Sequence, residues 1–111
     1  MYLQIVAWDL SRSQATVEGL RGYLKDYAVD AYSTLDGMAM KVWFGNPEKQ
    51  VWGAVYLWDS LEHAHGITTV TRVVDLIGYP PTSVSVFPVE AISRGRSRHD
   101  VIVGLGLALE N

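Results

Sequence analysis

The sequence contains no cysteine, which excludes a disulfide framework and any chemistry that depends on a thiolate. No apolar run approaches the roughly 20 residues that a membrane-spanning helix needs. The N-terminus, MYLQIVAWDL, has no basic segment before its apolar residues and is interrupted by Asp9, unlike a secretory signal peptide. We therefore expect a soluble, cytoplasmic protein with no membrane partner.

Positive charge is also scarce. Nine Lys and Arg residues are outnumbered by twelve Asp and Glu, which gives a formal net charge of −3. An acidic chain is a poor electrostatic match for the phosphate backbone of nucleic acids, so we expect no nucleic-acid partner. The 111 residues are enough for one domain with its own hydrophobic core.

Hydrophobic periodicity predicts the element order strand, helix, strand, strand, helix, strand. The predicted strands are residues 2–8, 38–45, 51–58 and 82–92. Capping-box spacing places the two helix starts at Ser11 and Asp59, and Gly66 is expected to kink the second helix or split it into two. This order predicts an α+β, ferredoxin-like βαββαβ fold with a four-stranded antiparallel sheet. Helices would cover one sheet face, and the other apolar face implies a partner.

The central hairpin concentrates the aromatic side chains. If residues 46–49 form its loop, Gly45 pairs with Gln50 and Trp43 with Trp52, and side chains alternate between two faces. The predicted aromatic face carries Ala39, Lys41, Trp43, Trp52, Ala54, Tyr56 and Trp58. The predicted aliphatic face carries Met38, Met40, Val42, Phe44, Val51, Gly53, Val55 and Leu57.

These aromatic rings have two interpretations. Indole and phenol groups need hydrogen-bond partners when buried, and neighbours in a core can supply them. Alternatively, the rings line a small-molecule pocket between sheet and helices, which is the interpretation we favour. The predicted substrate-binding residues are Trp8, Trp43, Trp52, Trp58 and Lys41.

The segments KVW (41–43) and GAVYLWDSLEHA (53–64) resemble the YdhR-like mono-oxygenases of the dimeric α/β-barrel superfamily. The resemblance covers residues 2–92 and includes the last strand, SVSVFPV. It implies a homodimer whose sheets pack face to face, with one pocket per subunit and Trp58 in the pocket. Related antibiotic-biosynthesis oxygenases oxidise electron-rich polycyclic phenols with O₂ and no cofactor. The first strand lacks the Asn of haem-degrading relatives, so we expect no haem and no other cofactor.

Four polar residues are candidates for chemistry. His65 and His63 are either exposed helix residues or a general base acting on a phenol, with His65 preferred. Their spacing puts them roughly 200° apart on a helix, so they cannot hold one metal, and we expect no metal site. Lys41 either extends to solvent or stabilises a phenolate or enolate. Tyr56 either donates a hydrogen bond to substrate or packs in the core.

The C-terminal segment differs from the domain predicted for residues 1–92. Residues 93–100, SRGRSRHD, are polar and basic like a linker, whereas residues 101–110, VIVGLGLALE, are almost wholly apolar. An exposed apolar segment of this kind is an aggregation hazard. We expect residues 93–111 to form a linker and an arm or extra strand that docks on its own subunit or is exchanged with a second one.

The sequence thus predicts a homodimeric, cofactor-independent mono-oxygenase acting on an aromatic or polyketide-like small molecule, with O₂ as a candidate co-substrate. A cyclase or isomerase using the same pocket for proton transfer is one alternative. A non-catalytic small-molecule-binding protein is the other.

Overall fold

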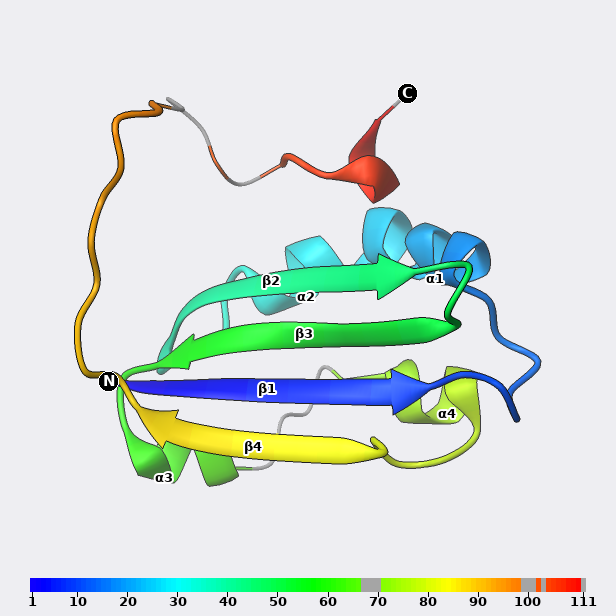
Figure 1. The fold of residues 1–111 in the computed structure, drawn as a ribbon, viewed down its shortest axis with the longest axis horizontal. Coiled ribbons are helices and arrows are strands. Elements are labelled where there is room, and N and C mark those ends of the chain that lie inside the picture. Colours follow the sequence, from blue (N-terminus) through cyan, green and yellow to red (C-terminus); the bar gives the residue numbers. More distant parts are fainter. Residues whose placement is uncertain (67–70, 99–101, 103, 111) are drawn as a thin grey trace.

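The computed structural model describes residues 1–66, 71–98, 102 and 104–110 (Figure 1). Its elements are β1 (Tyr2–Asp9), α1 (Val17–Tyr23), the π-helix η1 (Leu24–Ala28), α2 (Val29–Tyr32), β2 (Met38–Asn46), β3 (Val51–Trp58), α3 (Leu61–His65), α4 (Val73–Ile77), β4 (Ser83–Pro88) and the 3₁₀-helix η2 (Leu107–Leu109). The sheet order is β2-β3-β1-β4 and every neighbouring pair is antiparallel. The predicted ferredoxin-like α+β fold is confirmed.

The first helix begins later than the Ser11 spacing predicted. Thr16 caps α1, and its hydroxyl accepts a hydrogen bond from the Gly19 amide at 3.0 Å. The Ser11 amide instead donates to the Asp9 carboxylate at 2.9 Å, which forms a local turn after β1. A capping-box spacing identifies the type of cap but does not decide between several nearby hydroxyl residues.

The second predicted helix is divided into α3 and α4, as the glycine inside it suggested. Ser60, rather than Asp59, caps α3, because its hydroxyl accepts a hydrogen bond from the His63 amide at 3.2 Å. Gly66 follows α3 in an extended conformation. The helical spacing expected at residues 67 and 70 lies outside the described residues.

The hairpin register differs by two residues from the predicted one. Gly45 lies opposite Trp52, and Trp43 lies opposite Ala54. Because strand side chains alternate with a period of two, this shift leaves the predicted faces unchanged. A bulge between Met38 and Met40 is the exception. It places Met38 opposite Trp58 and against the core, so its assignment to the aliphatic face was wrong.

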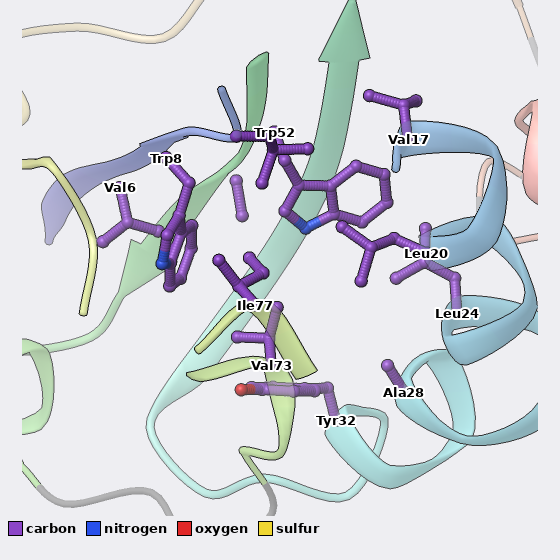
Figure 2. Close-up of a cluster of buried hydrophobic side chains, with 12 residues drawn as sticks. Val6, Trp8, Val17, Leu20, Leu24, Ala28, Tyr32, Trp52, Val73 and Ile77 are labelled. Atoms are coloured by element: carbon purple, nitrogen blue, oxygen red, sulfur yellow. The ribbon is translucent and has the colours of Figure 1, made fainter. Parts of the chain in front are cut away.

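The hydrophobic core lies between the aromatic sheet face and the helices (Figure 2). Its buried members are Val6, Trp8, Leu10, Val17, Leu20, Leu24, Ala28, Tyr32, Trp52, Ala54, Val73 and Ile77. Trp8 and Trp52 project from β1 and β3 toward α1, η1 and α4. Burying two indoles accounts for much of the apolar area that this small domain removes from water.

The opposite face of the sheet, here called the open face, carries Leu3, Ile5, Met40, Val42, Phe44, Val55, Leu57 and Phe87. In Figure 1 all the labelled helices lie behind the sheet. Val42 and Phe87 are each 51% exposed. An apolar surface of this extent is characteristic of an interaction site.

The C-terminal segment returns across the helical layer. Residues beyond β4 pass along one end of the sheet, and η2 lies over α1 (Figure 1). Ala108 packs against the core, whereas Leu105 and Leu107 are 59% and 67% exposed. Within the described residues, the segment contacts α1 and η1 through the 3₁₀-helix η2, and its exchange with a second subunit stays a prediction. No helix in the described ranges is both long and apolar enough to cross a bilayer.

Two glycines provide a matched test of packing. A Cβ on Gly53 would lie 2.4 Å from the Val6 carbonyl oxygen and 2.5 Å from the Phe44 ring, whereas a Cβ on Gly22 would have no neighbour within 4 Å. Gly53→Ala should lower the free energy of unfolding by about 1–3 kcal/mol, because a backbone strand must shift. Gly22→Ala, in α1, should raise it by about 0.5–1 kcal/mol. Urea denaturation measures both; equal effects would contradict the packing described here.

Candidate functional site

A cavity of about 470 Å³ opens at the free edge of β2. Its wall consists of side chains from α1, η1, α2, β2, β3 and the C-terminal segment: Val17, Arg21, Leu24, Val29, Met40, Lys41, Val42, Trp43, Phe44, Gly45, Trp52, Ile102, Leu105, Gly106, Leu107, Ala108 and Leu109. Consecutive β2 residues contribute, so the cavity extends around both sides of this edge strand. Its volume is typical of small-molecule sites, which are roughly 300–1,000 Å³.

Lys41 is enclosed by an aromatic cage, formed by Tyr32 of α2, Trp43 of β2 and Tyr56 of β3. The Lys41 Nζ lies 3.5 Å from the ring centroid of Tyr32, 4.3 Å from that of Tyr56 and 4.6 Å from that of Trp43. Ring faces attract a cation at such distances. The cage surrounds the amine of this wall residue with π-systems.

Neighbouring contacts hold the cage rings in place. The Tyr32 hydroxyl is 2.6 Å from the Thr71 hydroxyl, and the Tyr32 ring meets Trp43 edge to face at a centroid distance of 5.6 Å. Tyr56 stacks on Trp58, with centroids 5.1 Å apart and an interplanar angle of 12°. Ordered rings keep the space around the amine fixed before any ligand binds.

Two opposing effects act on the charge of Lys41. Burial lowers the pKa of Lys41 to about 6, because moving an ammonium group out of water is costly. The ring faces of the cage favour the ammonium form and act against that shift. Burial, followed by the nearby Tyr32 phenol, raises the pKa of Tyr56, so its hydroxyl keeps its proton at neutral pH.

Lys41 is a residue of the cavity wall, whereas Tyr32 and Tyr56, two of the three rings around its amine, are not. None of the hydrogen bonds and ion pairs of the described residues involves Lys41. Nor does any fully buried side-chain nitrogen or oxygen in those residues lack a partner, so Nζ must remain accessible. Nζ is therefore not fully sealed by the protein, and Lys41 itself borders the cavity.

The structure divides the predicted substrate-binding residues into two groups. Lys41, Trp43 and Trp52 line the cavity. Trp8 and Trp58 are only 5% and 4% exposed and do not line it. Their indole N–H groups donate to the Tyr79 carbonyl at 2.9 Å and to the Gln4 side-chain oxygen at 2.8 Å. For these two rings, the core interpretation holds and the pocket prediction is corrected.

Of the three predicted catalytic residues, one lies next to the cavity-wall residue Lys41 and two lie away from the cavity. Tyr56 reaches the site through the cage around Lys41. His63 and His65 are exposed on α3, outside the cavity wall. The His63 Nδ1 lies 2.8 Å from the Ser60 hydroxyl, and its ring packs over Gly37. Within the described ranges, no group of three or more His, Asp or Glu side chains is placed to hold a metal.

Sequence reasoning missed Arg21 and Tyr32. Regular helical spacing after Leu24 favours Tyr27 and Ala31 as the next core-facing residues, whereas Ala28 and Tyr32 are the buried ones. The π-helical turn of η1 holds one extra residue and rotates the following turn toward the core. The four-residue spacing of Leu20, Leu24, Ala28 and Tyr32 was the available signal.

Comparison with known proteins supports the fold of this chain but does not identify a family. No protein-family model and no curated protein matches the chain. A solved structure from Deinococcus radiodurans, described as "a putative antibiotic biosynthesis monooxygenase", is similar with a TM-score of 0.50 and 17% sequence identity. The match covers 89% of this chain and 100% of that one. At this identity the likeness supports the fold, and the resemblance to YdhR-like proteins stays a prediction.

Proposed function

We propose that the protein is a cofactor-independent mono-oxygenase that binds an electron-rich aromatic small molecule in the cavity at the β2 edge. The observation that carries this proposal is the caged amine of Lys41, a residue of the wall of a largely apolar cavity. The fold it shares with the Deinococcus radiodurans protein, and that protein's description, are consistent with it.

Lys41 is the proposed proton acceptor. A neutral amine takes the proton of a bound phenol and becomes an ammonium group, which the cage rings and the new phenolate both stabilise. The phenolate transfers an electron to O₂ more readily than the phenol does. For an anthrone-type substrate, a ring CH₂ becomes C=O. One oxygen atom of O₂ enters this product and the other leaves as water, while the substrate supplies the electrons.

The rings of the cavity wall have a positioning role in this proposal. Trp43 and Trp52 offer flat surfaces against which an aromatic substrate packs. Tyr56, whose raised pKa keeps its hydroxyl protonated, is available as a hydrogen-bond donor to a substrate oxygen. His63 and His65 have no part in this mechanism, because both lie outside the cavity wall.

Oxygen uptake with 1,8-dihydroxyanthrone tests the activity. We expect uptake above the uncatalysed rate, matched by quinone formation, in the wild type and in Lys49→Met, which alters an exposed lysine. Lys41→Met should lose the enzymatic uptake. Product formation without oxygen uptake would favour a cyclase or isomerase. Quenching of tryptophan emission without turnover would favour a non-catalytic binder.

We further propose that the open face joins two subunits into a homodimer, sheet against sheet. Phe87 and Val84 both lie on β4 with similar exposure, 51% and 54%, but on opposite faces, because Phe87 pairs with Leu3 and Val84 with Val6. Phe87→Arg should shift the protein toward monomer, since it buries an unpaired charge. Val84→Arg should not. Analytical ultracentrifugation distinguishes them; an intact Phe87→Arg dimer would contradict this interface.

A further inference from the structure

The described residues of the cavity wall carry charges of one sign only. Among the described lining residues, Arg21 and Lys41 carry charge, and both are cationic. Arg21 lies in the last turn of α1 and Lys41 on β2, so two different elements bring them to the same space. No carboxylate lines the described part of the wall.

Neither cation is neutralised by a described residue. In the described part of the chain, no ion pair or hydrogen bond reaches the side chain of Arg21 or of Lys41. A cation removed from water is costly unless it is paired, and proteins ordinarily supply a carboxylate next to it. The cage rings offset part of this cost for Lys41, but they bring no negative charge. The site therefore has a place for an anion that no described residue fills.

The remaining wall residues are mostly apolar, so they favour an anion that also has a large apolar part. Trp43, Trp52, Leu24, Val29 and Leu109 surround the space with apolar surface. An inorganic anion would leave this surface unused, and a phosphate group is usually held by several backbone N–H donors. A planar guanidinium and an ammonium group suit a carboxylate, which accepts hydrogen bonds from either. The complementary ligand is an aromatic ring system that carries a carboxylate.

We infer that the cavity at the β2 edge binds aromatic carboxylates, with Lys41 and Arg21 as the counter-charges and Trp43 and Trp52 as the ring contacts. This inference rests on the proposed function, since it names the substrate class of the same site. It goes beyond that proposal by requiring a negative group on the ligand. While Lys41 is protonated against this group it does not accept a phenol proton, so the proton transfer proposed above applies to ligands that leave Lys41 neutral. Arg21 and Lys41 thus become the residues that determine specificity.

Calorimetric titration of the full-length protein with 2-naphthoate and with methyl 2-naphthoate tests the inference. The two probes share the ring system, but only the first carries a charge. We expect 2-naphthoate to bind at least tenfold more tightly than the ester at pH 6. Arg21→Gln should reduce this ratio, and Lys41→Met should bring it close to one. Lys25→Gln, which removes an exposed lysine of η1 outside the cavity wall, should leave it unchanged.

Equal affinity for acid and ester, or binding of neither probe, would overturn the inference. So would a ratio that Lys41→Met leaves intact. Circular dichroism of each variant establishes that it is folded before its affinity is compared. The oxygen-uptake assay uses a neutral substrate, so each proposal can fail while the other stands. Charge selectivity without uptake would support the ligand class alone, and uptake without selectivity would support the oxygenase alone.

Discussion

Replacing Lys41 by methionine should stabilise the protein by about 1–3 kcal/mol at pH 6, even though it removes the proposed proton acceptor. Methionine is unbranched and flexible, so it can follow the path of the lysine side chain among the cage rings. It requires no counter-charge, whereas the Lys41 ammonium has no anionic partner among the described residues. The lost attraction to the three rings limits the gain.

The stability gained by Lys41→Met should decrease as the pH rises. The pKa of Lys41 falls from its ordinary 10.5 to about 6 in the folded protein. Between these values the unfolded chain holds a proton that the folded chain lacks, so raising the pH favours folding. The cost of burying Lys41 is therefore complete below pH 6 and disappears as the pH approaches 10.5. The advantage of Lys41→Met should shrink over that interval.

Urea denaturation of the wild type and Lys41→Met at pH 5.5, 7 and 9 measures this difference. Lys49→Met, at an exposed loop position, should leave the free energy of unfolding and its pH dependence unchanged. If Lys41→Met is less stable than the wild type at every pH, the attraction between the ammonium and the cage rings outweighs the cost of burial. A site that gives up stability to hold an unpaired amine is more consistent with function than with folding.

The strands and their faces were predictable because alternation has a period of two and tolerates the register error made here. Lys41, Trp43, Trp52 and Tyr56 were placed on one face from the sequence, and they remain there. The errors in assigning core-facing residues arose where one extra residue interrupts the regular spacing of a strand or helix. The bulge at Ala39 moved Met38, and after the π-turn of η1 Ala28 is fully buried whereas Tyr27 packs against the core only in part.

The location of the cavity could not be predicted in the same way. The partners that make Trp8 and Trp58 core residues are the Tyr79 carbonyl and Gln4, which are distant in sequence. The cavity wall also depends on the return of η2 over α1 from the far end of the chain. Alternation indicates which rings share a face, but only tertiary packing decides whether helices fill the space above each ring.

Binding of 2-naphthoate should weaken by up to tenfold for each pH unit above pH 6. The carboxylate needs Lys41 in its ammonium form, and the pKa of that group in the free protein is about 6. Each further pH unit requires the ligand to recruit a proton at a cost of about 1.36 kcal/mol. The bound anion raises the pKa of Lys41 in the complex. Above that raised pKa, the affinity no longer changes with pH.

The other groups around the amine should not produce this profile. Tyr32 and Tyr56 face Lys41 from α2 and β3, and burial raises the pKa of Tyr56 away from the measured range. Desolvation raises the pKa of the neighbouring Tyr23 to about 12. Lys41 is therefore the group that titrates between pH 6 and 9.

Calorimetry at pH 6, 7, 8 and 9, in buffers of different ionisation enthalpy, measures both affinity and proton uptake. Near pH 8 the wild type should take up close to one proton per 2-naphthoate bound. In Lys41→Met, affinity should be weaker and independent of pH, with no proton uptake. Arg21→Gln should weaken binding while it retains the pH dependence, because it removes a counter-charge but no titrating group. A wild-type affinity that stays constant from pH 6 to 9 would show that the caged amine does not hold the carboxylate.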